Sequence, residues 1–437
     1  MPSRQMRKKL ALLVSLLFGM ESLALAQNAQ DGPFRLASVK YVGLSRYTES
    51  QANAEIGLRL GNTITMAQLQ AASDQLSKTG AFDRVTYRYG TRGNELSAEF
   101  KVHETDKVLP CVFDNFVWFS DQQLDQTLRA RVPFFTGVSP ENGTTISEIV
   151  AALEQLLHTS GVSGTVEQIA SAGGLGAPIS ALLFSVKGVA MPVRSVTFPG
   201  ASAITEGELV AASSQLMGQD YSASNVSVFG RAGLVPLYGR RGYLRAHFEK
   251  PQAKVVESGA NGPSQDIAVT LPVQEGSEYS WQKADWSGNQ QLPTGDLDQL
   301  LGMKAREVAN KDKIDTGFVA VKRAYDTKGF IDVSIDPKMI FDDASKSVSY
   351  DVTIAEGTQY HLAQVHFGGL PDRAAEELAN KWQLKPGDIY NATYVNEFVK
   401  SVAWPTIRKM GIQAKNVAIN SQRDKQAASV QLNIVFH

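Results

Sequence analysis

Six histidines are the side chains best suited to metal binding in this 437-residue chain. A shared metal site needs ligands that meet on one face of an element. Only His361 and His366 lie close in sequence, and a separation of five places them on opposite faces of a predicted strand. The remaining four are His103, His158, His247 and His437. We therefore interpret the histidines as structural or solvated, and predict no metal and no cofactor.

Other catalytic signatures are equally sparse. The glycine-rich stretch at 171–178 lacks the Lys-Ser or Lys-Thr pair of a phosphate-binding loop and fits a turn. No Gly-x-Ser-x-Gly nucleophile motif occurs. Cys111 is the only cysteine, so an intrachain disulfide is excluded; we interpret it as a buried small side chain, with intermolecular pairing as the alternative. The sequence therefore predicts that the protein is not an enzyme, and a periplasmic enzyme is the least favoured alternative.

The first 26 residues have the three parts of a secretory signal peptide. The basic segment at 4–9 precedes the apolar run Leu10–Phe18, and Ala24-Leu25-Ala26 has the small-x-small pattern of a signal-peptidase site. A retained anchor is the alternative, but it needs about 20 apolar residues. We expect residues 1–26 to be cleaved and the mature chain to be exported.

Composition and charge exclude some partner classes. The chain is 43% hydrophobic and 20% charged, as globular proteins are, and is long enough for several domains. The formal net charge is -1, and loss of four basic residues and Glu21 with the signal peptide changes it to -4. This charge argues against nucleic acid as a partner, because a nucleic-acid-binding domain is basic.

Glycines recur at a spacing close to 81 residues. Each of the five follows a helix-like stretch and precedes a strand-like one: Gly80, Gly161, Gly242, Gly329 and Gly411. A second marker, aromatic-x-Gly, ends a strand-like run at Tyr41–Gly43, Phe198–Gly200, Trp286–Gly288 and Phe367–Gly369. A third, Glu-Gly-x-x-Tyr, contains Gly276 and Gly357. Three markers with one period predict five repeats in which these glycines are structural.

The unit between 280 and 354 has the clearest pattern. A short alternating strand at 280–286 is followed by helical periodicity at 294–301 and 311–328. Two alternating stretches then begin at Phe330 and Ser347. We predict an α+β fold of five tandem β-α-α-β-β repeats in an elongated array, each repeat a three-stranded mixed sheet covered by two helices.

This pattern resembles an array of POTRA domains, the polypeptide-transport-associated domains of outer-membrane assembly factors. The resemblance rests on the aromatic-x-Gly marker, the Gly-aromatic strand start, and the junctions Val273–Tyr279 and Ile354–Tyr360. It implies five domains, as in the periplasmic arm of BamA-type factors. Their expected bounds are 34–105, 106–189, 190–276, 277–357 and 358–437, the second being the least marked.

Such factors normally continue into a membrane β-barrel, which needs at least about 8 strands. Here the fifth expected domain ends at His437, the last residue of the sequence. We therefore expect a POTRA arm without its barrel, in the periplasm and associated with the outer membrane through a partner.

The resemblance also implies where partners bind. In the family the strand after the second helix is an exposed edge that pairs with guest strands, which is β-augmentation. The implied edges are 243–248, 330–335 and 412–417. The predicted partner-binding residues are Tyr243, Leu244, Arg245, Ala246, His247, Phe248, Phe330, Ile331, Asp332 and Val333.

The leading hypothesis is thus a non-enzymatic periplasmic scaffold. Its expected partners are unfolded outer-membrane polypeptides, or an outer-membrane β-barrel or assembly subunit. The alternative is a rigid spacer or organiser that docks a separately encoded outer-membrane channel without contacting clients.

Overall fold

The computed structural model describes residues 33–172, 177–256 and 265–437. The expected signal peptide lies outside these residues. The described chain has a mixed α+β fold, as predicted, with its strands in several separate sheets. The described residues divide into two compact units: those within Met1–Cys111, Asp125–Gln155 and Ala170–Leu182 form the first, and those within Val112–Leu124, Leu156–Ile169 and Leu183–His437 form the second.

The first sheet has the strand order β2-β1-β4-β3, with β4 parallel to β1 and antiparallel to β3. Its elements are β1 (Phe34–Val42), α1 (Glu49–Ile56), β2 (Thr63–Ile64), α2 (Met66–Lys78), β3 (Phe82–Arg92) and β4 (Glu95–Glu104). Both helices begin with a capping box, at Thr48 and Thr65, which satisfies two orphan backbone donors at each start. Leu69 and Leu76 on α2 are buried in one core cluster with Phe100 on β4.

The next sheet has the order β6-β5-β8-β7. Its elements are β5 (Val108–Phe113), α3 (Asp121–Arg131), β6 (Val138–Pro140), α4 (Thr144–Thr159), β7 (Thr165–Ala172) and β8 (Ile179–Lys187). The prediction of three strands in each repeat is therefore wrong for these first two sheets. In each, a strand of two or three residues between the helices pairs with the first long strand and adds a fourth.

The strands between 193 and 274 form two sheets, β11-β12-β9 and β10-β13. The elements are β9 (Val193–Thr197), α5 (Glu206–Ala212), the 3-10 turn Ser214–Leu216, α6 (Ala223–Phe229), a π-helical turn Gly230–Leu234, α7 (Val235–Gly239), β10 (His247–Phe248), β11 (Gln252–Val255), β12 (Ile267–Thr270) and β13 (Val273–Gln274). Pro236 lies in the first turn of α7, directly after the π-helical turn. The wide turn fits a proline that cannot donate a helical hydrogen bond.

The last two sheets have the orders β14-β16-β15 and β17-β19-β18. The first contains β14 (Ser280–Ser287), α8 (Thr294–Leu301), α9 (Lys311–Thr327), β15 (Ser334–Asp342) and β16 (Ser347–Ala355). The second contains β17 (His361–Gly368), α10 (Asp372–Lys381), α11 (Ala392–Phe398), the π-helical turn Val399–Ala403, α12 (Trp404–Lys409), β18 (Val417–Asp424) and β19 (Ser429–Phe436). The order β-α-α-β-β is seen without additions at 280–355 only, among the described residues.

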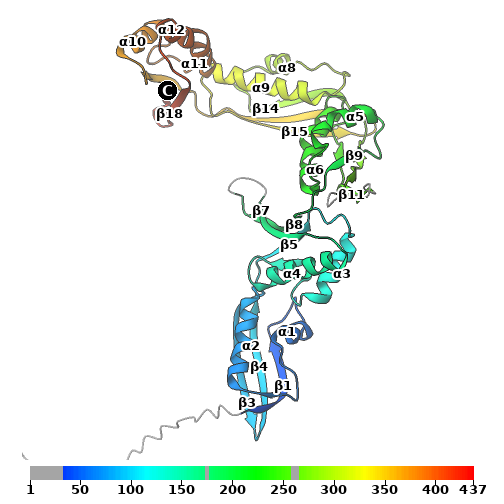
Figure 1. Ribbon diagram of the computed structural model, residues 1–437. Coiled ribbons are helices and arrows are strands. Elements are labelled where there is room, and N and C mark those ends of the chain that lie inside the picture. The colour runs from blue at the N-terminus through cyan, green and yellow to red at the C-terminus, as the bar shows by residue number, and fades with distance from the viewer. Residues whose placement is uncertain (1–32, 173–176, 257–264) are drawn as a thin grey trace, which may run out of the picture. The chain divides into compact units, whose positions relative to one another are not determined.

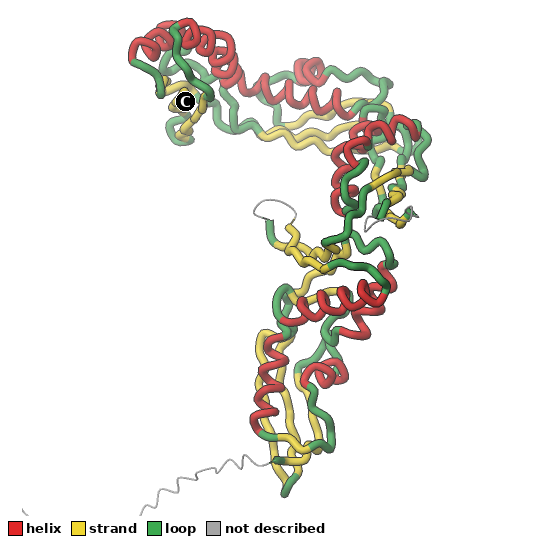
Figure 2. The backbone as a smooth tube through the Cα atoms, viewed as in Figure 1, coloured by secondary structure: helices red, strands yellow, loops and turns green. Residues whose placement is uncertain are grey.

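Two helices cover one face of the sheet at 280–355. Figure 1 shows α8 and α9 beside β14 and β15, and Figure 2 shows the same helices on one side of the strands. Leu297 on α8 and Val321 on α9 are buried in the same cluster as Val352 on β16. Burial of one such side chain stabilises the folded state by about 1.5–3 kcal/mol. The contacts between the helices and the sheet therefore hold this unit together.

The aromatic-x-Gly marker has a steric cause. A Cβ atom on Gly43, Gly200, Gly288 or Gly369 would lie 1.9–2.3 Å from a carbonyl oxygen of β4, β13, β16 or β19, respectively. Each of these glycines also has positive φ. Only glycine allows the chain to leave the first strand this close to its neighbour.

The glutamate of the Glu-Gly marker closes the same corner. Glu275 accepts hydrogen bonds from the backbone nitrogens of Ser202 and Ala203 at 2.8 and 3.0 Å. Glu104 accepts corresponding bonds from Ser45, Arg46 and Tyr47, and Glu356 from Gln291. These carboxylates satisfy the donors that the chain exposes after it passes the glycine.

A different carboxyl group makes stability depend on pH. Oε2 of Glu148 on α4 is buried without a hydrogen-bond partner. Burial, and then the charge of Glu55, raises the pKa of Glu148 from 4.5 to about 7. The folded protein therefore holds a proton that the unfolded chain releases above about pH 4.5, so stability falls as the pH rises from there to about 7.

We expect Glu148→Gln to stabilise α4 by about 1 kcal/mol at pH 8, because solvent screens part of the unfavourable charge. The variant should also lose this pH dependence. Hydrogen exchange of the α4 amides at pH 6 and pH 8, corrected for intrinsic rates, measures both effects. An unchanged difference between the two pH values would contradict the assignment.

Candidate interaction site: repeat junctions and free strand edges

The structure places most of the predicted partner-binding residues in turns rather than in strands. Tyr243–Ala246 and Phe330–Val333 are each closed by a hydrogen bond from the fourth residue's backbone nitrogen to the first residue's carbonyl, 3.2 Å long in both. Only His247 and Phe248 are in a strand, where they form β10 and pair with β13. The prediction that 243–246 and 330–333 are edge strands is therefore wrong. Their role in binding a partner stays a prediction.

The two turns contact the chain that begins the next sheet. The backbone nitrogen of Tyr279 donates to the carbonyl of Gly242, and that of Tyr360 to the carbonyl of Gly329, both at 2.9 Å. Gly242 and Gly329 have φ of 83°, and a Cβ on either would lie 2.7 Å from the tyrosine's carbonyl oxygen. The helix-ending glycine and the Glu-Gly-x-x-Tyr marker thus meet at one place in the fold.

The other glycines predicted to be structural also adopt the left-handed conformation. Their φ values lie between 73° and 79° at Gly80, Gly161, Gly276, Gly357 and Gly411. Such values strain residues with a side chain, so glycine is preferred at each position.

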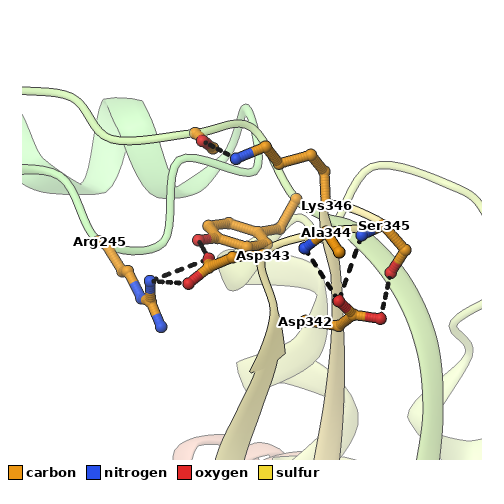
Figure 3. Close-up of polar contacts among 8 residues, drawn as sticks. Arg245, Asp342, Asp343, Ala344, Ser345 and Lys346 are labelled. Atoms are coloured by element: carbon orange, nitrogen blue, oxygen red, sulfur yellow. Dashed lines mark hydrogen bonds and ion pairs between the residues drawn. The ribbon is translucent and has the colours of Figure 1, made fainter.

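An ion pair fixes the junction between the third and fourth predicted repeats. Arg245 donates to Asp343 at 3.0 Å, and the hydroxyl of Tyr279 donates to the same carboxylate. The guanidinium also lies 4.1 Å from the ring centre of Phe341, a cation–π contact. Figure 3 shows Arg245 reaching Asp343 beside the turn in which Asp342 accepts from Ala344 and Ser345. The tyrosine hydrogen bond, and then Arg245, lowers the pKa of Asp343.

The next junction has the same arrangement with the charges exchanged. Asp332 takes the place of Arg245, accepts from the hydroxyl of Tyr360 at 2.8 Å, and pairs with Arg423 on β18. The tyrosine hydrogen bond lowers the pKa of Asp332, and the charge of Arg423 adds to this effect. Residues predicted to bind a guest strand therefore contact the chain of the next sheet.

Free strand edges lie elsewhere in the fold. The strands β3, β7, β15 and β18, each the first strand after the helices of its unit, lie at the end of their sheet orders, as does β11, which follows β10. Each of these five strands is therefore paired on one side only within its sheet. β3 is the longest, with 11 residues, and β11 has only four. Part of β11, Gln252 and Ala253, also lines a cavity of about 370 Å³ with Phe113, Phe116 and Tyr221.

The free backbone groups of β18 can be identified from its hydrogen bonds. Asn416 and His437 exchange two backbone hydrogen bonds of 3.1 and 2.9 Å, so Asn416 directs its groups toward β19. Successive residues of a strand alternate, so the next residue and every second one thereafter direct theirs away from the sheet. On β18 the outward residues are Val417, Ile419, Ser421 and Arg423.

The same reasoning applies to β3. The side-chain hydroxyl of Thr86 donates to the carbonyl of Lys101 at 3.4 Å, so this carbonyl faces β3 and the pair Thr86–Lys101 lies on the bonded side. The outward residues of β3 are therefore Val85, Tyr87, Tyr89 and Thr91. We call the outward residues of one strand its outward row. Neither of these two rows contains a proline, so each offers a continuous line of backbone donors and acceptors.

A shallow apolar groove runs beside β15. It has a volume of about 220 Å³ and is lined by Phe318, Val319 and Lys322 of α9 and by Val333, Ile335 and Pro337. Val319 and the strand residues Met339 and Ile340 are 50%, 40% and 56% exposed. These side chains could contact apolar residues of an extended segment laid along the edge.

The described residues show no arrangement for metal binding. No group of three His, Cys, Asp or Glu side chains in these ranges is placed to hold an ion. Burial raises the pKa of Cys111 to about 12, which keeps its thiol protonated and weakly nucleophilic at neutral pH. No helix in the described part of the chain is long and apolar enough to cross a membrane.

Comparisons with known proteins identify one of the repeats. The family model described as POTRA, surface antigen variable number repeat, matches residues 279–357. A protein of Treponema pallidum with the name "Putative outer membrane protein assembly factor" is 23% identical over 256 residues, which is 56% of this chain and 30% of that protein. The outer membrane protein assembly factor BamA of Buchnera aphidicola is 19% identical over 383 residues, 84% of this chain and 59% of that protein. The match thus spans 30% and 59% of the length of these two relatives.

Solved structures are also similar to part of the chain. POTRA domains 3–5 of Haemophilus influenzae BamA superpose with a TM-score of 0.43 and 18% identity, covering 56% of this chain and 96% of that one. The matched segment and the two assembly-factor sequences confirm the resemblance that the sequence markers predict. Residues 279–357 are a POTRA domain in a chain that resembles the outer-membrane protein assembly factors of the BamA type.

Proposed function

We propose that this protein is a non-enzymatic periplasmic scaffold that binds extended segments of outer-membrane polypeptides by strand addition. The observation that carries the proposal is the pair of continuous free edges on β3 and β18. Their outward N–H and C=O groups can pair with any extended chain, because backbone pairing is independent of the partner's side chains. The names of the relatives support assembly of outer-membrane proteins as the process.

In this proposal the docking sites are the free edges of β3 and β18 rather than the turns at 243–246 and 330–333. A guest strand along β3 would meet Tyr87 and Tyr89, of which Tyr89 is 47% exposed, and along β18 it would meet Ile419, which is 37% exposed. Membrane strands of about 10 residues alternate apolar and polar side chains. Such a segment could place apolar residues against these side chains and polar residues in water.

The test substitutes proline on the outward rows. Tyr89→Pro with Ile419→Pro removes one outward donor from each edge while every bond to the neighbouring strand stays in place. We expect affinity for a urea-unfolded outer-membrane protein, measured by fluorescence anisotropy after dilution, to fall about tenfold or more. The matched control, Tyr89→Ala with Ile419→Ala, removes the side chains but keeps the N–H groups and should lose less. Equal affinities for wild type and the proline variant, with circular dichroism unchanged, would refute strand addition.

A rigid spacer is the second candidate function, and the two junctions favour it. Each combines a backbone hydrogen bond, a tyrosine hydroxyl and an ion pair, which restricts movement between neighbouring domains. A protein that captures an outer-membrane channel but shows no affinity for unfolded polypeptide would fit this function and exclude the first.

A further inference from the structure

The free edge β15 of the POTRA domain at 279–357 differs from the edges β3 and β18 in one feature. β15 pairs with β16 alone, and residue 337, near its middle, is a proline opposite Val352. A proline in a strand lacks the N–H that its position would otherwise offer. Whether this loss affects the sheet or the free edge depends on which way residue 337 faces.

Two contacts on the far side of β16 settle the direction. The hydroxyl of Ser287, which ends β14, donates to the carbonyl of Val352 at 3.3 Å. A Cβ on Gly288 would lie 2.0 Å from the carbonyl oxygen of Ile354. Both carbonyls therefore face β14 and cannot also bond to β15.

The pairing of β15 with β16 shows which residues of β15 face outward. Ile335 lies opposite Ile354 and Pro337 opposite Val352, and in an antiparallel ladder the members of such non-bonded pairs direct their groups outward. Alternation adds Met339 and Phe341 to the outward row. The missing N–H thus belongs to the second of four outward positions, and the proline ring stands where a guest carbonyl would approach.

The corresponding rows of β3 and β18 contain no such gap. All four outward residues of each retain an N–H: Val85, Tyr87, Tyr89 and Thr91 on β3, and Val417, Ile419, Ser421 and Arg423 on β18. β15 has an apolar groove beside its edge that would otherwise favour docking, and Pro337 itself lines that groove.

We propose that Pro337 determines which edges accept a guest strand, by interrupting β15 and directing extended polypeptides to β3 and β18. This inference rests on the proposed function. An edge proline is a known means of preventing unwanted strand pairing, and it costs the sheet no hydrogen bond when its nitrogen faces solvent. The POTRA domain can therefore keep an exposed apolar groove without pairing firmly through its edge.

The experiment restores the missing donor with Pro337→Ala in the full chain. The probe is a synthetic peptide of about ten residues with alternating apolar and polar side chains, the length of one membrane strand. Amide hydrogen exchange reports which outward rows the peptide protects. In wild type we expect slower exchange along β3 and β18 but not along β15. In the variant, Ile335, Ala at 337, Met339 and Phe341 should also be protected, with about tenfold tighter binding at this edge.

Two controls separate the donor from other effects. Asp336→Ala changes the adjacent residue, whose backbone faces β16, and should leave β15 unprotected. Met339→Pro added to Pro337→Ala should abolish the gained protection. Protection of β15 in wild type as strong as that of β3, or none in Pro337→Ala while β3 and β18 are protected, would overturn the role of Pro337 and leave the proposed function intact. No protection at any edge would overturn both.

Discussion

Replacing Gly288 by alanine is expected to destabilise the POTRA domain by about 3 kcal/mol or more. Two costs add. Gly288 has φ of 79°, a conformation that strains any residue with a side chain by about 1–2 kcal/mol. The new Cβ would also lie 2.0 Å from the carbonyl oxygen of Ile354, so the end of β14 would have to move away from β16.

Gly302 provides a matched control in the same domain. It also has positive φ, 70°, but the nearest atom to its Cβ position is 3.9 Å away, so Gly302→Ala should cost only the conformational part, about 1 kcal/mol. Hydrogen exchange of the amides of β14 and β16 gives the local free energy of opening for both variants. Equal losses in the two variants would show that the close carbonyl contact has no energetic weight.

The second large effect is expected at Glu275. Its side chain accepts hydrogen bonds from the backbone of Ser202 and Ala203 and from the Ser202 hydroxyl, and the residue is only 8% exposed. Glu275→Ala leaves these donors without their partner, at a cost of about 2–3 kcal/mol. The nearby exposed Glu278 is the control, since Glu278→Ala should change stability by less than about 0.5 kcal/mol. Denaturation followed by hydrogen exchange of the amides between 198 and 212 measures both.

The same carboxylate predicts sensitivity to acid. Burial acts to raise the pKa of Glu275, but the hydrogen bonds from Ser202 and Ala203 outweigh it and hold the pKa below its ordinary value of 4.5. Because the folded-state pKa is the lower one, the contribution of Glu275 is present above about pH 4.5 and is lost as the pH falls through the folded pKa. Glu275→Gln should flatten that part of the stability profile. An acid profile identical to that of wild type would contradict this assignment.

The repeat markers could be predicted from sequence because each reflects a local steric or hydrogen-bonding need. Where a Cβ atom would lie within 2.3 Å of a carbonyl oxygen, or where the chain needs positive φ after a helix, any residue other than glycine is strained. Glu275 and Glu356 close equivalent corners of their sheets, which accounts for their common spacing from a glycine and a tyrosine. The α+β class followed from these markers and from the periodicity between them.

The docking edge could not be placed correctly from the same pattern. The residues after Gly329 alternate as a strand does, yet Phe330–Val333 form a turn, and the strand begins only at Ser334. The turn is held by Asp332, whose partners Tyr360 and Arg423 are 28 and 91 residues away, and pairings at such separations leave no periodic signal. The fourth strand of the first sheet was missed because β2 has two residues, too few to alternate visibly.

One sequence signal for the edges was available. Pro337 lies two residues after the end of the predicted strand at 330–335, and proline within a strand is typical of an edge whose nitrogen faces solvent. It could have shown that the strand extends beyond 335 and that its outer side is free. The register with β16 was still needed to show that the proline faces outward.

The opposite charges at the two junctions distinguish one junction from the other. They therefore favour one order of the repeats along the chain. Arg245 and Asp332 occupy equivalent slots but carry opposite signs, and each is matched by the hairpin of its own successor. Deletion of the repeat between the two junctions would place Arg245 beside Arg423, so that two positive charges would face each other. Deletion or reordering of these repeats would therefore place like charges together at a junction, which disfavours any other order of the repeats.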